Sequence, residues 1–380
     1  MSKISRRGAI PPFFVMEVMK AANARAAAGG DVIHLEVGQP STPAPAPVRK
    51  AAEAALRSER LGYTEALGLP VLREAISGHY RRRFGVAVPP ERIVVTTGSS
   101  GAFLLAFLAA FDPGQRVAIA EPGYPGYRHI LSLLGLEAVV LPARHDAGFR
   151  VSAELAGAAG PLDGLLVASP ANPTGTVLAP ESLRALVDFA AARDMLLILD
   201  EIYHGITYGA AAETVLKFSD RAIAINSFSK YFSMTGWRLG WMVVPAELLR
   251  PVECLAQNLF ISAPTLSQWA ALAAFEAYDE LDGNVARYAE NRGILSQGLE
   301  TAGFDAFAPA DGAFYLYADI SRFAADSQDF CRRMLAETGV AATPGIDFDA
   351  REGQNFVRFS YAGLTADMIE AVKRLKDWRK

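Results

Sequence analysis

The stretch from Leu165 to Tyr203, LLVASPANPTGTVLAPESLRALVDFAAARDMLLILDEIY, decides the fold class. It opens with the apolar run Leu165–Ala168 and ends just after a second run, Met195–Leu199. Both runs are continuous rather than alternating, which is typical of parallel strands that are covered on both faces. Between them, apolar residues repeat from Leu183 at i, i+3, i+4 and i+7, behind Pro180 as a helix opener. This strand–helix–strand unit predicts a parallel sheet with crossover helices.

The same alternation continues on both sides of this unit. Further apolar, β-rich runs are expected to form strands at Ile93–Thr96, Val117–Ala120, Ala222–Ile225 and Met242–Val244. We therefore expect an α/β fold with a mostly parallel central sheet of the seven-stranded type and helices on both faces. Functional side chains of such a sheet gather at the carboxyl ends of its strands.

The two ends of the chain have a different pattern. Residues 12–28 are expected to form one Ala-rich helix, and helices are expected to mix with short strands after about residue 285. A smaller α+β domain built from both termini is therefore expected. We predict residues 1–44 as an N-terminal arm and part of the small domain, 45–285 as the large domain, and 286–380 as the small C-terminal domain.

Composition excludes several classes of protein. The 380 residues include 37 Lys or Arg and 41 Asp or Glu, a balance that does not favour nucleic-acid binding through charge. The apolar run Phe103–Phe111 is about half as long as a membrane span, so we expect no membrane segment. None of the five histidines has HxxxH or HxH spacing, so no metal site is expected.

The compartment is expected to be the cytoplasm. The two cysteines, Cys254 and Cys331, lie far apart and offer no disulfide framework. Ser5-Arg6-Arg7 resembles a twin-arginine export signal, but Pro11-Pro12 and Glu17 interrupt the apolar segment that should follow it.

Polar segments follow four of the expected strands or lead into them. They are SPANPTG at 169–175, DEIY at 200–203, SFSK at 227–230 and TGWRLG at 235–240. Each alone is explained by a turn, a helix cap or a solvated lysine. Together they place an amide, a carboxylate, a phenol, an amine and a guanidinium at one crevice. This set suits pyridoxal 5′-phosphate, which needs a Schiff-base lysine and an acidic partner for its ring nitrogen.

The order NPTG, DEIY, SFSK and MTGWRLG resembles the class I/II aminotransferases, pyridoxal-phosphate enzymes of fold type I. It looks most like the bacterial aspartate, aromatic and alanine-type enzymes. Gly38-Gln-Pro, Gly62-Tyr63-Thr and Phe356–Ser360 extend the resemblance over essentially the whole chain. The resemblance implies a large cofactor-binding domain and a ping-pong transfer of the amino group of an L-amino acid to a 2-oxo acid.

The resemblance also implies roles for individual residues. Lys230 would form the Schiff base and shuttle protons, and Asp200 would pair with the ring nitrogen. Around the cofactor, Tyr124 would stack on the ring, Asn172 and Tyr203 would donate to its phenolate, and Ser227 and Arg238 would bind the phosphate.

The segment Thr97–Gly101 follows an expected strand and opens the expected apolar helix Ala102–Phe111, so its backbone N–H groups and the positive helix end are expected to form an anion site. Its phosphate ligands would be Ser99, Ser100 and Gly101. Tyr63 would reach the phosphate of a second subunit, which implies a homodimer with shared active sites.

The substrate's α-carboxylate would bind Arg358, with help from Asn172 and the backbone of Gly38. A residue-based alternative makes Arg358 a surface charge on an edge strand.

Two features bear on the donor side chain. Relatives that prefer acidic substrates can have a lysine where this chain has Ser100, and Phe13 and Phe14 lie in an apolar segment resembling one that closes over substrate. We therefore expect neutral or aromatic donors to be better than aspartate, with 2-oxoglutarate or pyruvate as acceptor.

Other functions remain open at this stage. A carbon–sulfur β-lyase shares these motifs and would release pyruvate and ammonia from cystathionine without an acceptor. A non-catalytic regulator would carry a winged-helix head, for which no room is expected before Gly38. An acyltransferase of the same fold usually has a histidine where Tyr124 stands.

Overall fold

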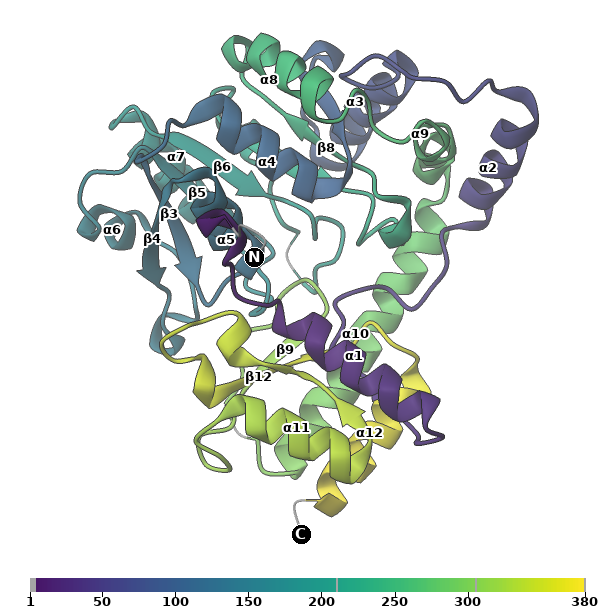
Figure 1. Ribbon diagram of the computed structural model, residues 1–380, viewed down its shortest axis with the longest axis vertical. Coiled ribbons are helices and arrows are strands. Elements are labelled where there is room, and N and C mark those ends of the chain that lie inside the picture. Colours follow the sequence, from purple (N-terminus) through teal and green to yellow (C-terminus); the bar gives the residue numbers. More distant parts are fainter. Residues whose placement is uncertain (1–4, 210, 305, 379–380) are drawn as a thin grey trace.

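The computed structural model describes residues 5–209, 211–304 and 306–378, so the outermost ends of the expected terminal domains lie outside the described residues. A central sheet of seven strands has the order β2-β8-β7-β6-β5-β3-β4 (Figure 1). Neighbouring strands are parallel except that β8 is antiparallel to β2 and β7. The mixed, mostly parallel sheet expected from the sequence is confirmed. Its strands are β2 (Ile93–Thr96), β3 (Arg116–Glu121), β4 (Glu137–Pro142), β5 (Gly164–Ala168), β6 (Leu196–Asp200), β7 (Ile223–Ser227) and β8 (Gly240–Val243).

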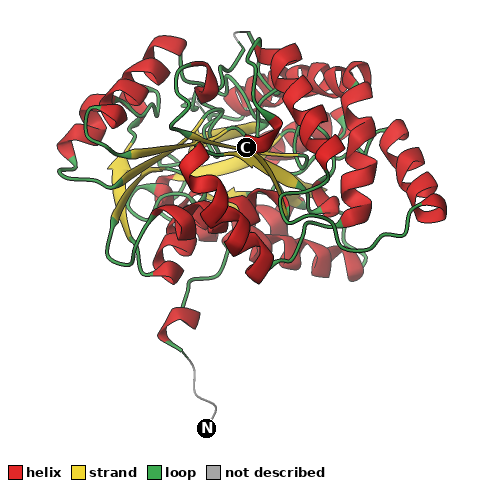
Figure 2. Cartoon of the chain, turned by 90° about the horizontal axis from the view of Figure 1, so that it is seen from above, coloured by secondary structure: helices red, strands yellow, loops and turns green. Residues whose placement is uncertain are grey.

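Helices cover both faces of this sheet, as the view from above shows (Figure 2). The alternation of side chains along β5 sends successive residues to opposite faces of the sheet: Leu165 packs into the core cluster on one face and Leu166 into the cluster on the other. The surrounding helices are α2 (Ala46–Ser58), α3 (Pro70–Phe84), α4 (Gly98–Ala110), α5 (Pro125–Leu134), α6 (Ala153–Ala158), α7 (Pro180–Ala191), α8 (Ala246–Leu259) and α9 (Thr265–Leu272).

Strand β4 was not identified from the sequence. It lies at the edge of the sheet, Glu137 is exposed and Val139 is only half-buried. Between Glu137 and Pro142 it nevertheless carries the continuous apolar run Ala138–Leu141, which is the signal that could have identified it.

The remaining elements combine the two ends of the chain. Strand β1 pairs in parallel with β10, and β12 is the middle strand of an antiparallel sheet between β11 and β9. The long helix α10 runs from the large sheet's layer into this smaller part (Figure 1). The elements are α1 (Phe14–Ala27), β1 (Ile33–His34), α10 (Tyr278–Thr301), β9 (Tyr315–Asp319), α11 (Ser327–Thr338), β10 (Val340–Ala341), β11 (Thr343–Pro344), β12 (Phe356–Ser360) and α12 (Thr365–Trp378).

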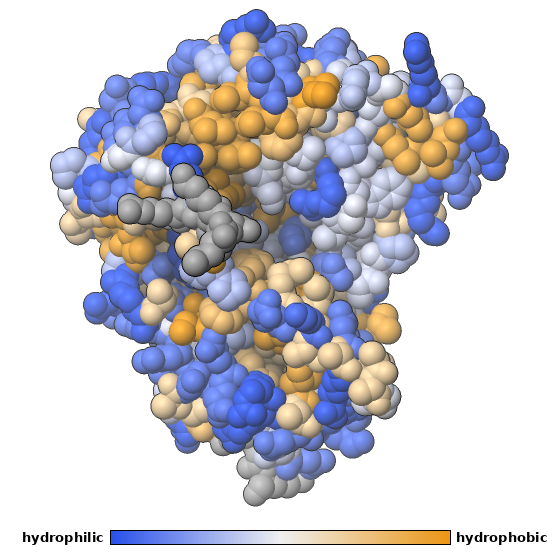
Figure 3. Space-filling view, viewed as in Figure 1, coloured by the Kyte–Doolittle hydropathy of each residue, from blue (hydrophilic) through white to orange (hydrophobic). Residues whose placement is uncertain are grey.

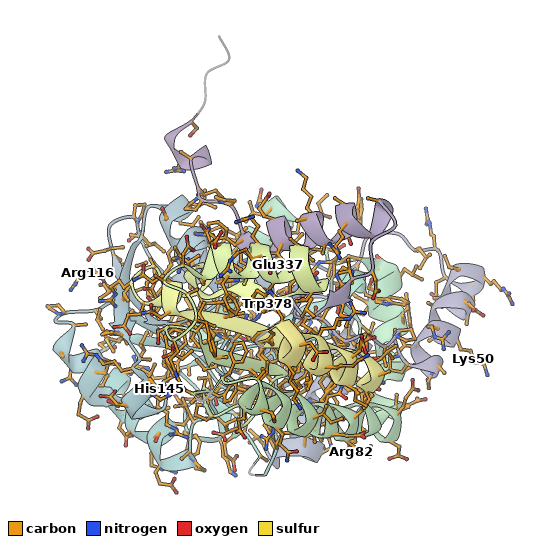
Figure 4. The ribbon with its side chains drawn as sticks, turned by 90° about the horizontal axis from the view of Figure 1, so that it is seen from below. Lys50, Arg82, Arg116, His145, Glu337 and Trp378 are labelled. Atoms are coloured by element: carbon orange, nitrogen blue, oxygen red, sulfur yellow. The ribbon has the colours of Figure 1, made fainter. Side chains whose placement is uncertain are left out.

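Near the C-terminus, α12 contacts α11 in the smaller part of the structure. The indole Nε1 of Trp378, at the end of α12, donates to Glu337 Oε2 of α11 at 2.6 Å (Figure 4). Across the described ranges, no helix combines the length and apolar character needed to cross a bilayer. The same ranges contain no group of three or more His, Cys, Asp or Glu side chains placed to hold a metal ion.

Candidate active site

The carboxyl ends of β5, β6 and β7 bring four of the expected residues to one edge of the sheet. Asn172 lies in the turn after β5, Asp200 is the last residue of β6, and Tyr203 follows it. Lys230 stands shortly after the end of β7. Because β6 pairs in parallel with both β5 and β7, these strands end together, and their polar residues meet at one crevice.

Lys230 presents an amine of lowered basicity to this crevice. Its Nζ donates to the backbone oxygen of Gly38 at 2.5 Å. The pKa of Lys230 is lowered to about 8, mainly by burial and then by the charges of Arg358 and Arg238, while the charge of Asp200 acts in the opposite direction. The residue is nevertheless only partly buried. An amine with such a pKa is partly unprotonated near neutral pH and can act as a nucleophile or a base.

Asp200 is a buried carboxylate, 2% exposed. Burial raises the pKa of Asp200 to about 6, whereas the Tyr127 hydroxyl, the Ile202 N–H and the charge of Lys230 lower it. The Tyr127 hydroxyl donates to Asp200 Oδ2, and the Ile202 N–H donates to Oδ1 at 3.0 Å. Sequence reasoning missed Tyr127. Its position on α5, one helical turn after Tyr124, is the signal that places both rings at the same crevice.

A second tyrosine that sequence reasoning missed lies beside Tyr203. Tyr315, the first residue of β9, has its hydroxyl 2.6 Å from that of Tyr203. A Cβ at Gly38 would lie 1.9 Å from the Tyr315 hydroxyl, so no side chain fits at this position. Gly38 therefore lets the backbone approach both Tyr315 and Lys230 closely.

Arg358 is a buried guanidinium, and its interpretation as an edge-strand surface charge is wrong. It stands on the middle strand β12 and is 3% exposed. Its Nη1 donates to Asn172 Oδ1 at 3.0 Å and its Nη2 to the backbone oxygen of Glu36 at 2.5 Å. The rings of Tyr315 and Phe348 lie 4.3 and 4.7 Å from the guanidinium carbon. Its Nε is buried without a hydrogen-bond partner among the described residues.

The start of α4 differs from the expectation. The apolar helix was expected over Ala102–Phe111, but α4 begins at Gly98, so that Gly98 to Gly101 form its first turn. Gly98 has φ +71°, and a Cβ there would lie 2.6 Å from Arg238 Nη2. The glycine thus lets the Arg238 guanidinium pack directly against the positive end of α4, where backbone N–H groups have no partner within the helix.

Ser227 lies beside the same helix end. It pairs with Gly240 across β7 and β8, and a Cβ at Gly240 would lie 2.9 Å from the Ser99 backbone nitrogen. The Ser227 hydroxyl is 2.9 Å from that of Ser229. Backbone N–H groups, hydroxyls and a guanidinium therefore converge on one point, which is the chemistry of an anion site.

Tyr124 forms an aromatic wall of the crevice. Its ring meets Tyr127 edge-on at 5.2 Å and Phe13 edge-on at 5.8 Å between ring centres. The structure does not bring every expected residue into this set. Ser100 is exposed at the start of α4. Tyr63 is 83% exposed and, within the described part of the chain, has no hydrogen bond or ring contact to the crevice residues.

Known proteins are similar to this chain in sequence and in fold over nearly their whole length. Residues 30–375 match the family Aminotransferase class I and II. The chain is 53% identical to a valine–pyruvate aminotransferase of Mycobacterium tuberculosis over 99% of this chain and 98% of that protein.

Solved structures give the same result. A crystal structure of an aminotransferase from Mycobacterium tuberculosis superimposes with a TM-score of 0.97 at 52% identity, covering 100% of this chain and 99% of that one. The aspartate aminotransferase of Thermus thermophilus with maleate gives 0.94 at 32% identity, covering 99% and 100%. Enzymes of class I and II use pyridoxal 5′-phosphate. The chain belongs to the class I and II aminotransferase family and is a pyridoxal-phosphate-dependent aminotransferase.

Proposed function

We propose that this aminotransferase takes the amino group of a neutral L-amino acid with an apolar side chain, such as valine, and delivers it to pyruvate or another 2-oxo acid. The observation that carries the proposal is one crevice holding the Lys230 amine, the Arg358 guanidinium and an apolar wall of Phe13 against Tyr124. The 53% identical relative is named for valine and pyruvate, which supports the same pair here.

The residues present fit pyridoxal 5′-phosphate. No side chain fits at Gly98, because a Cβ there would lie 2.6 Å from Arg238 Nη2. A phosphate held by backbone N–H groups requires such a position without a side chain. An amine, a carboxylate and a phenol lie at separate strand ends, matching an aldehyde, a ring nitrogen and a phenolate. When bound, the cofactor supplies an electron sink for the electrons of the substrate's Cα–H bond.

Lys230 would hold the cofactor through its aldehyde and, once substrate has taken its place there, would hold and move the proton at Nζ. Its lowered pKa of about 8 suits both tasks, because neither protonation state is strongly favoured near neutral pH. The Gly38 carbonyl, 2.5 Å away, orients the amine.

Asp200 provides a negative charge for the ring nitrogen. Its own pKa of about 6 leaves it mostly ionised at neutral pH, and a cation beside it increases that fraction. Tyr127 holds one of its oxygens, so the carboxylate has a fixed direction. Tyr203 and Asn172 donate to the phenolate, and Tyr124 covers the ring face.

The phosphate binds where α4 begins. Its ligands would be the backbone N–H groups of the first-turn residues Ser99, Ser100 and Gly101, together with the side chains of Ser227 and Arg238. The Arg238 guanidinium adds a charge-assisted contact to the backbone N–H groups.

Arg358 binds the substrate's α-carboxylate, assisted by Asn172 and the backbone of Gly38. The planar fork is oriented by Asn172 and by the aromatic rings of Tyr315 and Phe348, so little reorganisation accompanies binding. Its unpartnered Nε is a further donor in the same site.

The active enzyme is a homodimer in which Tyr63 reaches the partner's phosphate site. Tyr63 is 83% exposed, and Leu259 at the end of α8 and Ile261 just after it are each about half exposed. Figure 3 shows apolar surface over α4 and α8 on the same side of the molecule. Exposed apolar surface of this kind is typical of subunit contacts. Within each subunit, residues 45–285 would form the large domain, with 1–44 and 286–380 in the small one.

A panel of donors at fixed pyruvate tests the substrate. Valine and other apolar donors should exceed aspartate by about tenfold or more in kcat/KM, because an unpaired carboxylate against the Phe13 wall loses its hydration. Aspartate or glutamate as the best donor would contradict the proposal. Product formation without any acceptor would indicate lyase chemistry.

A further inference from the structure

A carboxylate far away in the sequence caps the first residues of α1. Asp347, in the short 3₁₀ turn Gly345–Asp347 after β11, accepts from the Phe14 N–H at 3.1 Å and from the Val15 N–H at 3.2 Å. The side chain is 1% exposed. The first N–H groups of a helix have no partner within it, and Phe13 at the N-cap offers no side-chain bond. Asp347 therefore supplies the cap that the local sequence lacks.

The turn that carries Asp347 is itself held to the large sheet's layer. The Asp347 backbone oxygen accepts from Arg128 Nη2 of α5 at 2.7 Å, and Arg128 Nη1 pairs with Glu121 at 3.2 Å. The next residue, Phe348, accepts through its backbone oxygen from the Gly123 N–H at 3.0 Å. The cap is thus fixed to the segment that leads into Tyr124.

Two walls of the crevice meet at this turn. The arm capped by Asp347 carries Phe13, whose ring packs edge-on against Tyr124. Phe348, beside Asp347, lies 4.7 Å below the Arg358 guanidinium. One turn of the chain therefore contacts both the proposed carboxylate-binding residue and the arm that faces the substrate side chain.

We propose that Asp347 is a positioning residue that locks the N-terminal arm in place and so makes Phe13 a preformed apolar wall for the donor side chain. This inference rests on the proposed preference for apolar donors. A carboxylate at a helix N-terminus is stabilised by the helix dipole as well as by its two hydrogen bonds. With the arm held, an apolar side chain meets a dry surface, and water does not enter beside it.

The same turn provides a matched control. Asp349 is also buried, at 9% exposed, and accepts from the backbone N–H groups of Arg351 and Glu352 at 2.8 and 3.0 Å. Its hydrogen bonds stay within its own loop. Asp347→Asn and Asp349→Asn therefore remove the same charge from the same segment, but only the first disturbs the arm.

Amide hydrogen exchange of the holoenzyme without substrate tests the lock directly. In Asp347→Asn, the Phe14 and Val15 amides should exchange about tenfold faster or more, because Asn retains one acceptor and turns an N–H group toward the other donor. In Asp349→Asn, both rates should match the wild type. Unchanged exchange in Asp347→Asn, or equal acceleration in both variants, would overturn the lock.

Donor kinetics test the consequence for specificity. The ratio of kcat/KM for valine to that for aspartate should fall about fivefold or more in Asp347→Asn, mainly through a higher KM for valine. Phe13→Ala should lower the ratio similarly while leaving the Phe14 and Val15 amides protected, which keeps the test usable if Asp347→Asn folds poorly. Faster exchange with an unchanged ratio would refute the specificity role. A wild type that does not prefer valine would contradict the proposed function, whereas the exchange result would still decide the lock.

Discussion

Removal of the Tyr127 hydroxyl should shift the ionisation of Asp200 toward higher pH. In the wild type, burial raises the pKa of Asp200 to about 6, and the bond from Tyr127 is the largest influence that lowers it. Tyr127→Phe leaves a buried carboxylate with the Ile202 N–H as its remaining hydrogen-bond donor. A hydrogen bond to a charged group contributes about 1.5–3 kcal/mol, which corresponds to about one to two pH units.

Cofactor binding to the apoenzyme reports this ionisation. Affinity for pyridoxal phosphate should fall on the acid side with a midpoint near the pKa of Asp200, because only the ionised form pairs with a protonated ring nitrogen. The midpoint in Tyr127→Phe should lie about one to two units above that of the wild type. Tyr317→Phe is the control, because Tyr317 is equally buried but its hydroxyl has no partner among the described residues.

The result that would refute this reasoning is a midpoint in Tyr127→Phe within about half a unit of the wild type and of Tyr317→Phe. Tyr127 would then fill space against Asp200 without affecting its charge. A shift to lower pH would show that the hydroxyl disfavours the carboxylate.

Three further outcomes are expected. Lys230→Ala should abolish turnover while keeping the fold, and borohydride should fix the cofactor covalently to the wild type alone; equal labelling of the variant would remove Lys230 from its proposed role. Refolded mixtures of Lys230→Ala and Tyr63→Phe subunits should regain part of the activity, whereas verified heterodimers without recovery would place Tyr63 away from a shared site. The free energy of unfolding of the apoprotein should fall by about 3 kcal/mol through Asp200 as the pH rises from about 4 to 6. The pKa of Asp200 in the folded protein lies above its ordinary value of 3.8, so the unfolded chain releases this proton at lower pH than the folded protein does. Folding above that pH therefore has to bury the charge of the carboxylate. Urea unfolding of the apo forms of wild type and Asp200→Asn across that range measures this difference, and parallel curves would contradict it.

Local sequence predicted the parts of the fold in which neighbouring residues share one environment. The predicted strands are recognisable because both of their faces are covered, so their central residues are apolar. Strand β4 was not predicted although it contains the apolar run Ala138–Leu141, and the structure places it, only partly buried, at the edge of the sheet. The helix was expected to begin only at Ala102, because glycine and serine have low helix propensity. Helix α4 in fact begins at Gly98, where the contact with Arg238 comes from a distant segment.

The residues of the candidate site also fall into those that the local sequence predicted and those that only the structure revealed. Asn172, Asp200, Tyr203 and Lys230 were predicted because parallel strands end at a common edge, so their positions follow from the strand pattern alone. Tyr127, Tyr315 and Asp347 were not, since each acts on a residue far along the chain: Asp200, Tyr203 and Phe14 respectively. The sequence by itself determined which chemical groups stand at the sheet edge. Only the tertiary structure decided which hydroxyls and carboxylates orient them, because those contacts form between segments that approach each other only when the two layers pack.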